Sequence, residues 1–523
     1  MDGQNRRKIE QALTTIARDY EKFQEDMVLD LSTVLDAMRS ESTRANRQLM
    51  GEACYMLRGM MTGVLLGPDH ALNSLTTAER RKVVATHDGL DAVMQCIIDA
   101  TGDADDTFLL QAFECLCELG GAEACRAQMA EEGTASLVLS LMSGHLANPR
   151  IAELGCHLCM QLLHQRPEVQ ESVASLPYDG GLAVVLYAMR QFPADGGVQS
   201  CAVGALAAAA DNASNSTLVV AQGGLALICA SMRSFPFPGD VLLQWHACQV
   251  LCHIANASPA DYTQLAVKEG ALVLVTGAMR GFPAHPQLQT AGIWFLDICA
   301  ALQPLHEMLM REHVVSLCCG ALRTFPDHSA LLLAAFSTLG SLASSRPHHD
   351  AIQREGAVAK VAASLRSHPR DKKVLAAALG ALAQLATIDA EALKAIRREG
   401  ALEASLAALK FFHVDGPIQR HGKRDILHCV YRAAPSCSVP PCPALIWSDM
   451  RGGLHVPQVC RLSSTRWRTH TAARWPSPWA WPTSRPALCG ECLSHHLHSI
   501  RLHFYSVVFT CALLPVCCYL HSK

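Results

Sequence analysis

The densest group of potential metal ligands lies near the C-terminal end of the chain. Cys489 and Cys492 are separated by two residues, and His495 and His496 follow them. Thiolates and imidazoles at this spacing supply half of a structural zinc site, which needs four ligands in tetrahedral geometry. The other cysteines of this region form no matching second pair. We therefore expect no bound metal and keep this Cys/His group as the alternative.

Motifs of catalysis and of cofactor binding do not occur in the sequence. The glycine pairs, such as Gly180-Gly181, stand between predicted helices, whereas a phosphate-binding loop follows a strand. There is no His-Glu-x-x-His, no Gly-x-Ser-x-Gly and no kinase catalytic loop. Histidines are scattered, and His348-His349 is best explained as the start of a short helix. The sequence predicts a protein without catalytic residues or cofactors.

Composition indicates which cellular compartment and which classes of partner to expect. A net charge of −3 gives no support to nucleic acid as a partner. Many of the 23 cysteines lie inside apolar helical runs, where a free thiol packs as a small hydrophobic group. No secretory signal opens the chain, so we expect a reducing compartment. We predict a cytoplasmic protein, with the nucleus or a cilium as alternatives.

Two marks recur along the chain in a common register. The first is a helix-stop residue, which recurs at steps of 44, 47, 43, 47, 43, 43 and 44 residues. Its positions are Gly89, Gly133, Gly180, Gly223, Gly270, His313, Gly356 and Gly400. The second mark is a Met/Leu-Arg-x-Phe-Pro motif at 189–193, 232–236, 279–283 and 322–326. A period of about 40–47 residues is typical of stacked helical repeats.

The repeat around Gly270 shows how each unit is expected to fold. Residues 261–269 predict a short helix that Gly270 ends, because glycine adopts the left-handed conformation at little cost. The next ten residues place apolar side chains at helical spacing. Pro283 ends that helix, since the residue before a proline is disfavoured in the helical region. A third, longer helix is predicted from Gln287 to Ala300.

This order of short, medium and long helix resembles the armadillo repeat, whereas HEAT repeats have two helices. The resemblance covers residues 70–430 and implies an all-α, right-handed solenoid of about eight three-helix repeats. His313 replaces glycine in one unit, and histidine is one of the few other residues found with positive φ. We therefore count that unit as degenerate but present.

Two regions flank the predicted solenoid, which spans residues 67–425. Residues 1–66 predict an N-terminal helical cap, and a helix that docks a partner or forms a dimer is the alternative. Residues 426–523 hold five of the seven tryptophans and show no helical period. Their composition resembles an altered splice or reading-frame product, and we expect disorder. Phe504 to Leu520 carries no charge, which leaves a weak possibility of a membrane anchor.

The resemblance also implies where partners bind. In armadillo proteins the third helices line a concave groove, where an Asn ladder holds an extended peptide and a Trp packs against it. The positions that correspond to the ladder are Glu118, Ala208, His253, Ile298, Ser341 and Gln384. None is Asn, whose amide would serve a peptide as both donor and acceptor. A folded domain or a helix is therefore the expected partner, and a nuclear-import adaptor is disfavoured.

At the corresponding Trp positions only Trp294 matches the family motif. Tryptophan is enriched among residues that dominate binding energy. The predicted binding residues are Trp294, Trp245, His253, Gln249, Glu118, Ser341 and Gln384. The alternative is that both tryptophans pack between repeats.

These features together predict a non-catalytic scaffold or adaptor that binds other proteins. No nucleic acid is expected as a partner, and a membrane is expected only if the anchor at 504–520 is real. The alternative is that the repeats are the N-terminal regulatory part of a larger enzyme, because similar arrays precede the kinase domain in leucine-rich-repeat-kinase-like proteins.

Overall fold

The computed structural model describes residues 31–64, 75–100, 104–176, 180–236, 238–258, 261, 268–412 and 416–422. Within these ranges every regular element is helical. The chain divides into two compact units, Met1–Phe282 and Pro283–Lys523. The predicted tail at 426–523, with its Cys/His group and its apolar stretch, lies outside the described residues, as does the first half of the predicted cap.

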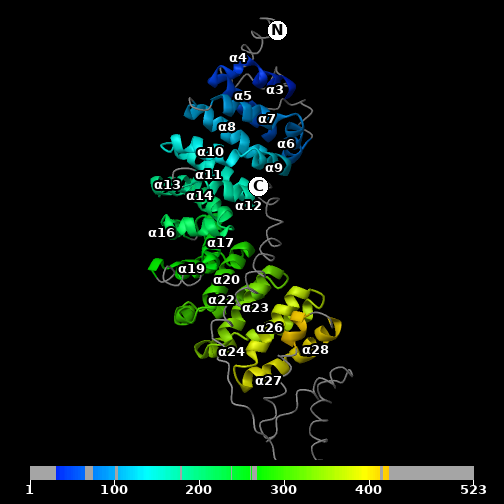
Figure 1. Ribbon diagram of the computed structural model, residues 1–523. Helices are drawn as coiled ribbons and strands as arrows, with labels where there is room; N and C mark the ends of the chain where they lie inside the picture. The colour runs from blue at the N-terminus through cyan, green and yellow to red at the C-terminus, as the bar shows by residue number, and fades with distance from the viewer. Residues whose placement is uncertain are drawn as a thin grey trace, which may run out of the picture. The chain divides into compact units, whose positions relative to one another are not determined.

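The first unit repeats the predicted order of short, medium and long helix (Figure 1). It begins with α3 (Leu31–Arg39), α4 (Glu41–Arg44) and α5 (Arg47–Thr62), of which α4 is the shortest, so the predicted order starts with the next triplet. Three triplets follow, and the first consists of α6 (Thr77–Thr86), α7 (Gly89–Ala100) and α8 (Asp106–Leu119). The second consists of α9 (Glu123–Glu131), α10 (Thr134–Gly144) and α11 (Pro149–Leu163). The third consists of α12 (Pro167–Ala174), α13 (Gly181–Gln191) and α14 (Gly196–Ala209). The last helices are α15 (Ala213–Ala221), α16 (Gly224–Ser234), α17 (Val241–Ala257) and α19 (Ala271–Gly281).

The second unit continues the same order. It contains α20 (Pro286–Ala300), the 3₁₀ turn η2 (Gln303–Leu305), α21 (His306–Arg311), α22 (Val314–Thr324) and α23 (Ser329–Ala343). These are followed by η3 (Arg346–His348), α24 (His349–Arg354), α25 (Ala357–Ser367), α26 (Lys372–Leu385), α27 (Ala390–Arg398) and α28 (Ala401–Phe411). The all-α repeat fold predicted from the sequence is confirmed.

The helix-stop residues adopt the positive φ that the sequence predicted, with one correction. Gly133, Gly223 and Gly270 have φ values of 71°, 76° and 69°, and His313 has φ 49°. In the first repeat the left-handed residue is Asp88, with φ 59°, and the predicted anchor Gly89 instead begins α7. Aspartate tolerates this conformation because its short polar side chain can hydrogen-bond locally. The left-handed position therefore lies one residue before the glycine that the sequence predicted.

Glycine is nevertheless required at position 89 for a different reason. A Cβ atom there would lie 2.4 Å from Val84 Cγ1 and 2.8 Å from the Val84 carbonyl oxygen. The backbone of α7 therefore approaches the end of α6 more closely than any side chain would permit. The same close approach recurs at Gly224, where a Cβ would lie 2.6 Å from Val219 Cγ1.

The second sequence mark is explained by a buried glutamine near the start of the third helix. The Gln244 side chain donates to the carbonyls of Met232 and Phe235, at 3.0 and 2.8 Å. These are carbonyls that the end of α16 leaves without helical donors. Gln199 binds the carbonyls of Met189 and Phe192 in the same way, and Gln419 binds those of Leu409 and Phe412.

The arginine of the same mark connects one repeat to the next. Arg190 donates to the carbonyl of Gln222 at 2.5 Å, immediately before Gly223. Arg233 donates to the carbonyl of Glu269 before Gly270. Arg366, which holds the corresponding position in a repeat where His368 replaces the phenylalanine of the mark, donates to the carbonyl of Glu399 before Gly400. A cationic side chain at a helix C-terminus is stabilised by the exposed carbonyls there. The two marks therefore keep a common register because they contact each other.

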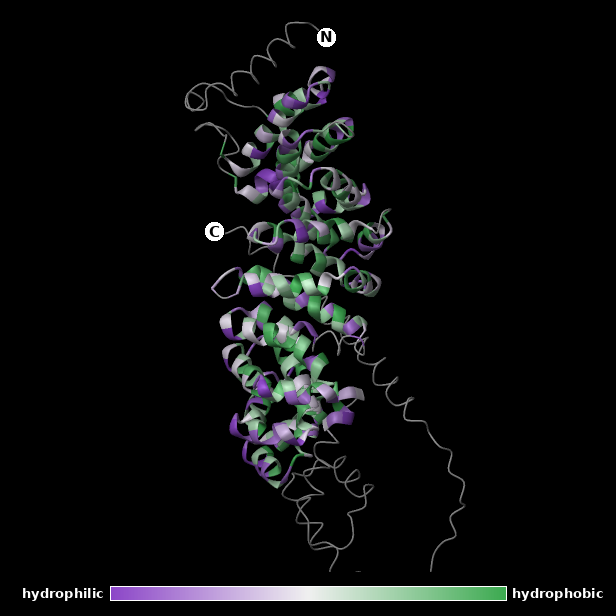
Figure 2. Cartoon of the chain, turned by 90° about the vertical axis from the view of Figure 1, so that its left-hand side faces the viewer, coloured by the Kyte–Doolittle hydropathy of each residue, from purple (hydrophilic) through white to green (hydrophobic). Residues whose placement is uncertain are grey.

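Third helices pack on third helices within each unit and form the core. In the first unit α5 packs on α8, α8 on α11, α11 on α14 and α14 on α17. In the second, α20 packs on α23 and α23 on α26. Hydrophobic residues are concentrated in the helix bodies (Figure 2). Phe108, Phe113, Phe295 and Phe336 are fully buried, and each such side chain stabilises the fold by about 1.5–3 kcal/mol.

The predicted role of the cysteines as packing residues is also confirmed. Cys115, Cys156, Cys159 and Cys248 are free and buried. Burial raises the pKa of the Cys159 thiol to about 12. These thiols therefore stay protonated and act as small apolar side chains.

Candidate protein-binding surface

Two positions in each repeat, one helical turn apart, mark the side of the third helix that corresponds to the groove of the family. His157 and Gln161 on α11 follow Gly133 by 24 and 28 residues. Gly204 and Ala208 on α14 follow Gly180 by the same numbers. We call the surface around these positions on α8, α11, α14 and α17 the third-helix face of the first unit. The sequence prediction lacks His157 and Gln161, which the spacing from Gly133 identifies.

The α8 part of this face is charged and ion-paired. Glu114 binds Arg58 of α5 and, at 3.2 Å, Arg150 of α11, so that one carboxylate connects three successive third helices. Arg150 also pairs with Glu153 at 2.8 Å. Half of the Arg150 side chain remains exposed. The pair of Arg150 with Glu153 is the more exposed one and contributes only about 0.2–1 kcal/mol, so it is available for exchange with a partner.

Glu118, one of the predicted binding residues, has a structural partner. Arg81 of α6 donates to its carboxylate through Nε at 3.1 Å and through a terminal nitrogen at 2.5 Å. The Arg81 side chain is only 5% exposed. Glu118 therefore neutralises a nearly buried cation, and its replacement would also disturb the packing of α6 on α8.

The α14 part of the face is built from small residues, over which larger side chains lie. A Cβ at Gly204 would be 2.5 Å from Met160 Sδ and 3.0 Å from His246 Nδ1. A Cβ at Gly197 would be 2.9 Å from the Glu153 carboxyl carbon. Met160 and Glu153 belong to α11, and His246 belongs to α17. At both glycines a larger residue would require these side chains to shift.

On α17 the predicted residues differ in exposure. Trp245 and Gln249 are buried, at 6% and 8% exposure. The Trp245 ring stacks on His246, with ring centroids 4.7 Å apart. The His253 side chain is 13% exposed and lies beside Asp211, with 3.8 Å between Nδ1 and Oδ1. Burial lowers the pKa of His253, and His164 lowers it further, whereas Asp211 opposes the shift.

In the second unit the predicted tryptophan is also covered. Trp294 on α20 is 5% exposed. Ser341 on α23 and Gln384 on α26 are half-buried. Ser337 of α23 donates to the carboxylate of Asp297 of α20 at 2.8 Å, and Asp297 is fully buried. The burial of Trp294 agrees with the alternative of packing between repeats, and a contribution to binding stays a prediction.

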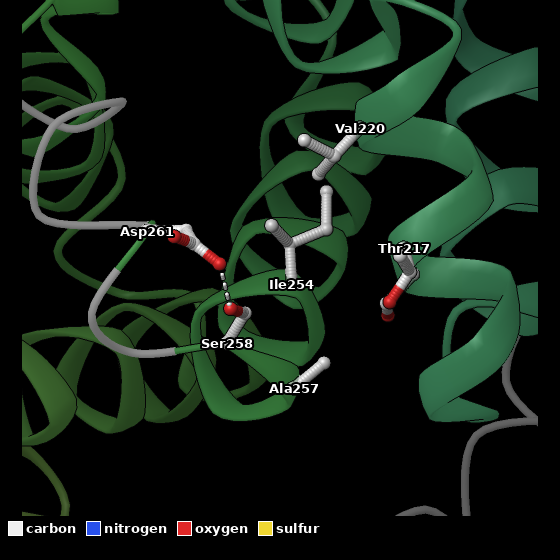
Figure 3. A pocket seen from close by; sticks show the side chains of 7 residues that line it. Thr217, Val220, Ile254, Ala257, Ser258 and Asp261 are labelled. Atoms are coloured by element: carbon white, nitrogen blue, oxygen red, sulfur yellow. Dashed lines mark hydrogen bonds between the residues drawn. The ribbon is translucent and has the colours of Figure 1, made fainter.

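A small recess lies outside this face, between α15 and the end of α17. Its volume is about 90 Å³, and Thr217, Val220 and Ile254 contribute to its mostly apolar wall (Figure 3). At its rim the Ser258 hydroxyl donates to Asp261 at 2.5 Å. The described residues contain no group of three or more His, Cys, Asp or Glu side chains that could hold a metal ion.

Among the described helices none has both the length and the apolar composition of a single membrane span. The two helices Ala213–Ala221 and Gly224–Ser234, which are bent by 80° relative to each other, together have the length and composition of a span, and nothing else supports one.

Solved structures with the same arrangement of helix triplets identify the fold. The crystal structure of an engineered protein matches with a TM-score of 0.58 and 18% identity, over 77% of this chain and 89% of its own. A chain from a study of a phosphorylation switch in the cadherin–β-catenin interaction matches with a TM-score of 0.58 and 14% identity, over 81% of this chain and 77% of its own. This chain has an armadillo-type helical-repeat fold.

Sequence comparison agrees with this assignment of the armadillo fold. A family model described as the LRRK2 ARM repeat matches residues 179–397. Protein aardvark of Dictyostelium discoideum is 32% identical over 76 residues, which are 14% of this chain and 10% of aardvark. The armadillo scaffold fits a role in protein interaction. An array of this kind is in general a non-catalytic scaffold.

Proposed function

We propose that this armadillo protein is a non-catalytic adaptor that binds a folded domain or a helix of another protein through the third-helix face of the first unit. The observation that carries the proposal is the change along this face from charged, ion-paired side chains to small residues. Ion-paired side chains on α8 and α11 adjoin the small residues of α14, over which Met160 and His246 lie. Such a surface offers charged side chains beside the half-buried Met160 and His246.

The kind of partner follows from what the face lacks. At the positions of the family's Asn ladder the first unit carries Glu118, Gln161, Ala208 and His253. Glu118 is bound to Arg81, and Ala208 has no polar side chain. A regular ladder of amides along an extended peptide is therefore not available. A preformed helix or domain satisfies its own backbone and requires only side-chain contacts.

The proposal is tested with Ser200→Arg, which places a long cation on α14. Ser200 is half-buried and lies one helical turn before Gly204 on the same side of α14. An arginine there covers the small residues without removing a core contact. We expect the full-length variant to lose at least about ten-fold in affinity for its protein partner, or about 1.4 kcal/mol. Partners are identified by quantitative co-purification, and affinities are then measured with the purified pair.

Ser140→Arg is the matched control, because Ser140 is exposed on α10, a second helix. It introduces the same side chain into the same unit and should leave binding intact. If both variants lose the same partner, or neither loses any, the third-helix face is not the binding surface. Circular dichroism and unfolding midpoints must be equal for the two variants.

A second candidate function is supported by the family match at residues 179–397. Here the repeats would be the regulatory part of a larger leucine-rich-repeat-kinase-like enzyme. Sequencing of the transcript beyond codon 424 distinguishes the two candidates. A continuous reading frame that encodes a catalytic domain supports the second, and a further repeat supports the adaptor.

The cytoplasm is the proposed location of the protein, with the nucleus and the cilium as alternatives. The location is tested by imaging the full chain with a small tag at either end. A fluorescent fusion of residues 495–523 tests the membrane anchor separately, because a diffuse signal contradicts it.

A further inference from the structure

The caps of the third helices differ in chemistry along the chain. The N-cap residues of α8, α14, α17 and α26 are Asp105, Asp195, Asp240 and Asp371, and that of α11 is Asn148. In α20 and α23, both in the second unit, the same position is occupied by His285 and His328. Histidine is not among the preferred N-cap residues.

Both histidines cap through a ring nitrogen that must carry no proton. His285 Nδ1 accepts from the amide of Leu288 at 3.1 Å, and His328 Nδ1 accepts from that of Leu331 at 3.3 Å. A protonated imidazole has two N–H donors and no acceptor. Protonation would therefore remove the cap and place a positive charge at the positive end of the helix dipole. An aspartate cap keeps its acceptor oxygens at any pH well above its own pKa.

A third histidine of the same region is buried beside a fourth. His348 at the end of η3 and His306 at the start of α21 are 1% and 5% exposed. Their rings meet edge to face, with centroids 5.5 Å apart. His306 Nε2 lies 2.9 Å from the carbonyl oxygen of Ala300, to which it must donate. Among the described residues His348 Nε2 has no hydrogen-bond partner, so a proton added there would be a buried, uncompensated charge.

We propose that α20 to α24 form an acid-labile segment, in which protonation of His285, His328 and His348 releases the first turns of α20 and α23 and separates the buried histidine pair. The segment is held only while these three side chains are neutral. Mild acid therefore loosens one part of the second unit and leaves the aspartate-capped helices in place.

The neighbouring charges do not offset this response. Burial lowers the pKa of His285 and of His328, and the first turns of α20 and α23 contain no acidic residue. Asp327 precedes His328 but lies 3.7 Å from His368 Nε2. Asp371 accepts from Ser329 and caps α26.

Around the histidine pair the adjoining helices carry both signs of charge. Burial lowers the pKa of His348 to about 4; His306 is the next cause, and His349 adds to the shift. The carboxylates on the adjoining helices are Asp297, which is bound by Ser337, Glu307, which is paired with Arg311, and the exposed Asp350. None of them contributes to the shift of His348.

The direction of the pH effect follows from these shifts. A histidine released into solvent has a pKa of about 6.5, above its value in the folded segment. Between the two values the opened state binds more protons, so the stability is complete above pH 6.5 and falls as the pH decreases towards about 4 for His348. Each histidine favours the opened state by up to about ten-fold per pH unit in this window.

The test is hydrogen exchange of the full chain at pH 7.5, 6.5 and 5.5, with rates corrected for the intrinsic effect of pH. We expect protection of the first turns of α20 and α23 to fall by up to about five-fold between pH 6.5 and 5.5, because the opened state is already half protonated at pH 6.5. The aspartate-capped α17 and α26 serve as internal controls and should show no such loss. Equal protection of all four helices at pH 5.5 would overturn the proposal.

Variants separate the caps from general acid sensitivity. In His285→Asn/His328→Asn the caps remain but no longer titrate, so the first turns of α20 and α23 should keep their protection at pH 5.5. In His285→Ala/His328→Ala the first turns should be weak at every pH. His348→Phe removes the titrating ring and should make α21 and α24 insensitive to pH. An Asn variant that remains as acid-sensitive as the parent contradicts the role of the caps, and the single Asn variants give the same test if the double variant folds poorly.

Discussion

At the scale of single residues, glutamines of the third helices stabilise the fold, although a polar side chain would be expected at the surface. Gln199, Gln244 and Gln419 each donate to two main-chain carbonyls at the end of the preceding helix. Gln244 is 2% exposed. Without these amides the carbonyls would be buried without a donor, which costs more than the hydrogen bond itself contributes.

Replacement of Gln244 by alanine should therefore destabilise the protein markedly. We expect a loss of about 2–4 kcal/mol in the free energy of unfolding, since two carbonyls lose their donor at once. Urea unfolding of the full chain followed by circular dichroism measures the loss. Gln191→Ala is the matched control, because Gln191 is exposed at the end of α13. Equal unfolding curves for the two variants would show that the carbonyls find other donors.

At the scale of the helix, the junction between repeats depends on arginines that reach a neighbouring helix end. Arg190, Arg233 and Arg366 extend from a second helix to the last carbonyls of the next short helix. The left-handed residue that follows turns the chain into the next second helix. A repeat is thus defined by its contact with the following repeat as much as by its own three helices.

Arg233→Ala and Arg366→Ala should each destabilise the protein by about 1 kcal/mol, the value of one hydrogen bond from a charged donor at a partly exposed site. Thermal unfolding monitored at 222 nm gives the change. Arg311→Ala removes an arginine whose pair with Glu307 is largely exposed, and we expect no measurable effect. A loss from Arg311→Ala as large as that from Arg233→Ala would argue against a special role of the junction.

At the scale of the whole molecule, repeat proteins respond to a defect locally because each repeat contacts only its neighbours. The first unit has a buried ionic contact, Arg81 with Glu118, that joins α6 to α8. Removal of Arg81 leaves the Glu118 carboxylate, which is 27% exposed, without its partner, at a cost of about 1–3 kcal/mol. The cost should be confined to the helices near α6.

Arg81→Ala tests this locality by hydrogen exchange of the full chain. We expect α5 to α8 to lose protection, whereas α23 and α26 in the second unit keep theirs. Lys394→Ala, which removes an exposed pair with Glu391, is the control and should change neither region. Loss of protection throughout both units would show that the chain unfolds as one cooperative body.

The sequence by itself determined the repeat and its helix order. Periodicity and helix-stop residues are local signals, because a left-handed turn or a proline acts on the backbone within a few residues. For this reason His313 was correctly predicted to have positive φ. Asp88 was missed, because aspartate occurs in many other conformations and the neighbouring Gly89 is the more common residue at a left-handed position.

The candidate surface depended on tertiary structure. The sequence proposed Trp245 and Trp294 for binding, but exposure is set by neighbouring helices that lie about 40 residues away in the chain, and both side chains are covered. The connection of Arg58, Glu114 and Arg150 likewise joins three repeats and has no local signature. Short-range sterics fix the helices of this protein, and only their packing decides which side chains remain available to a partner.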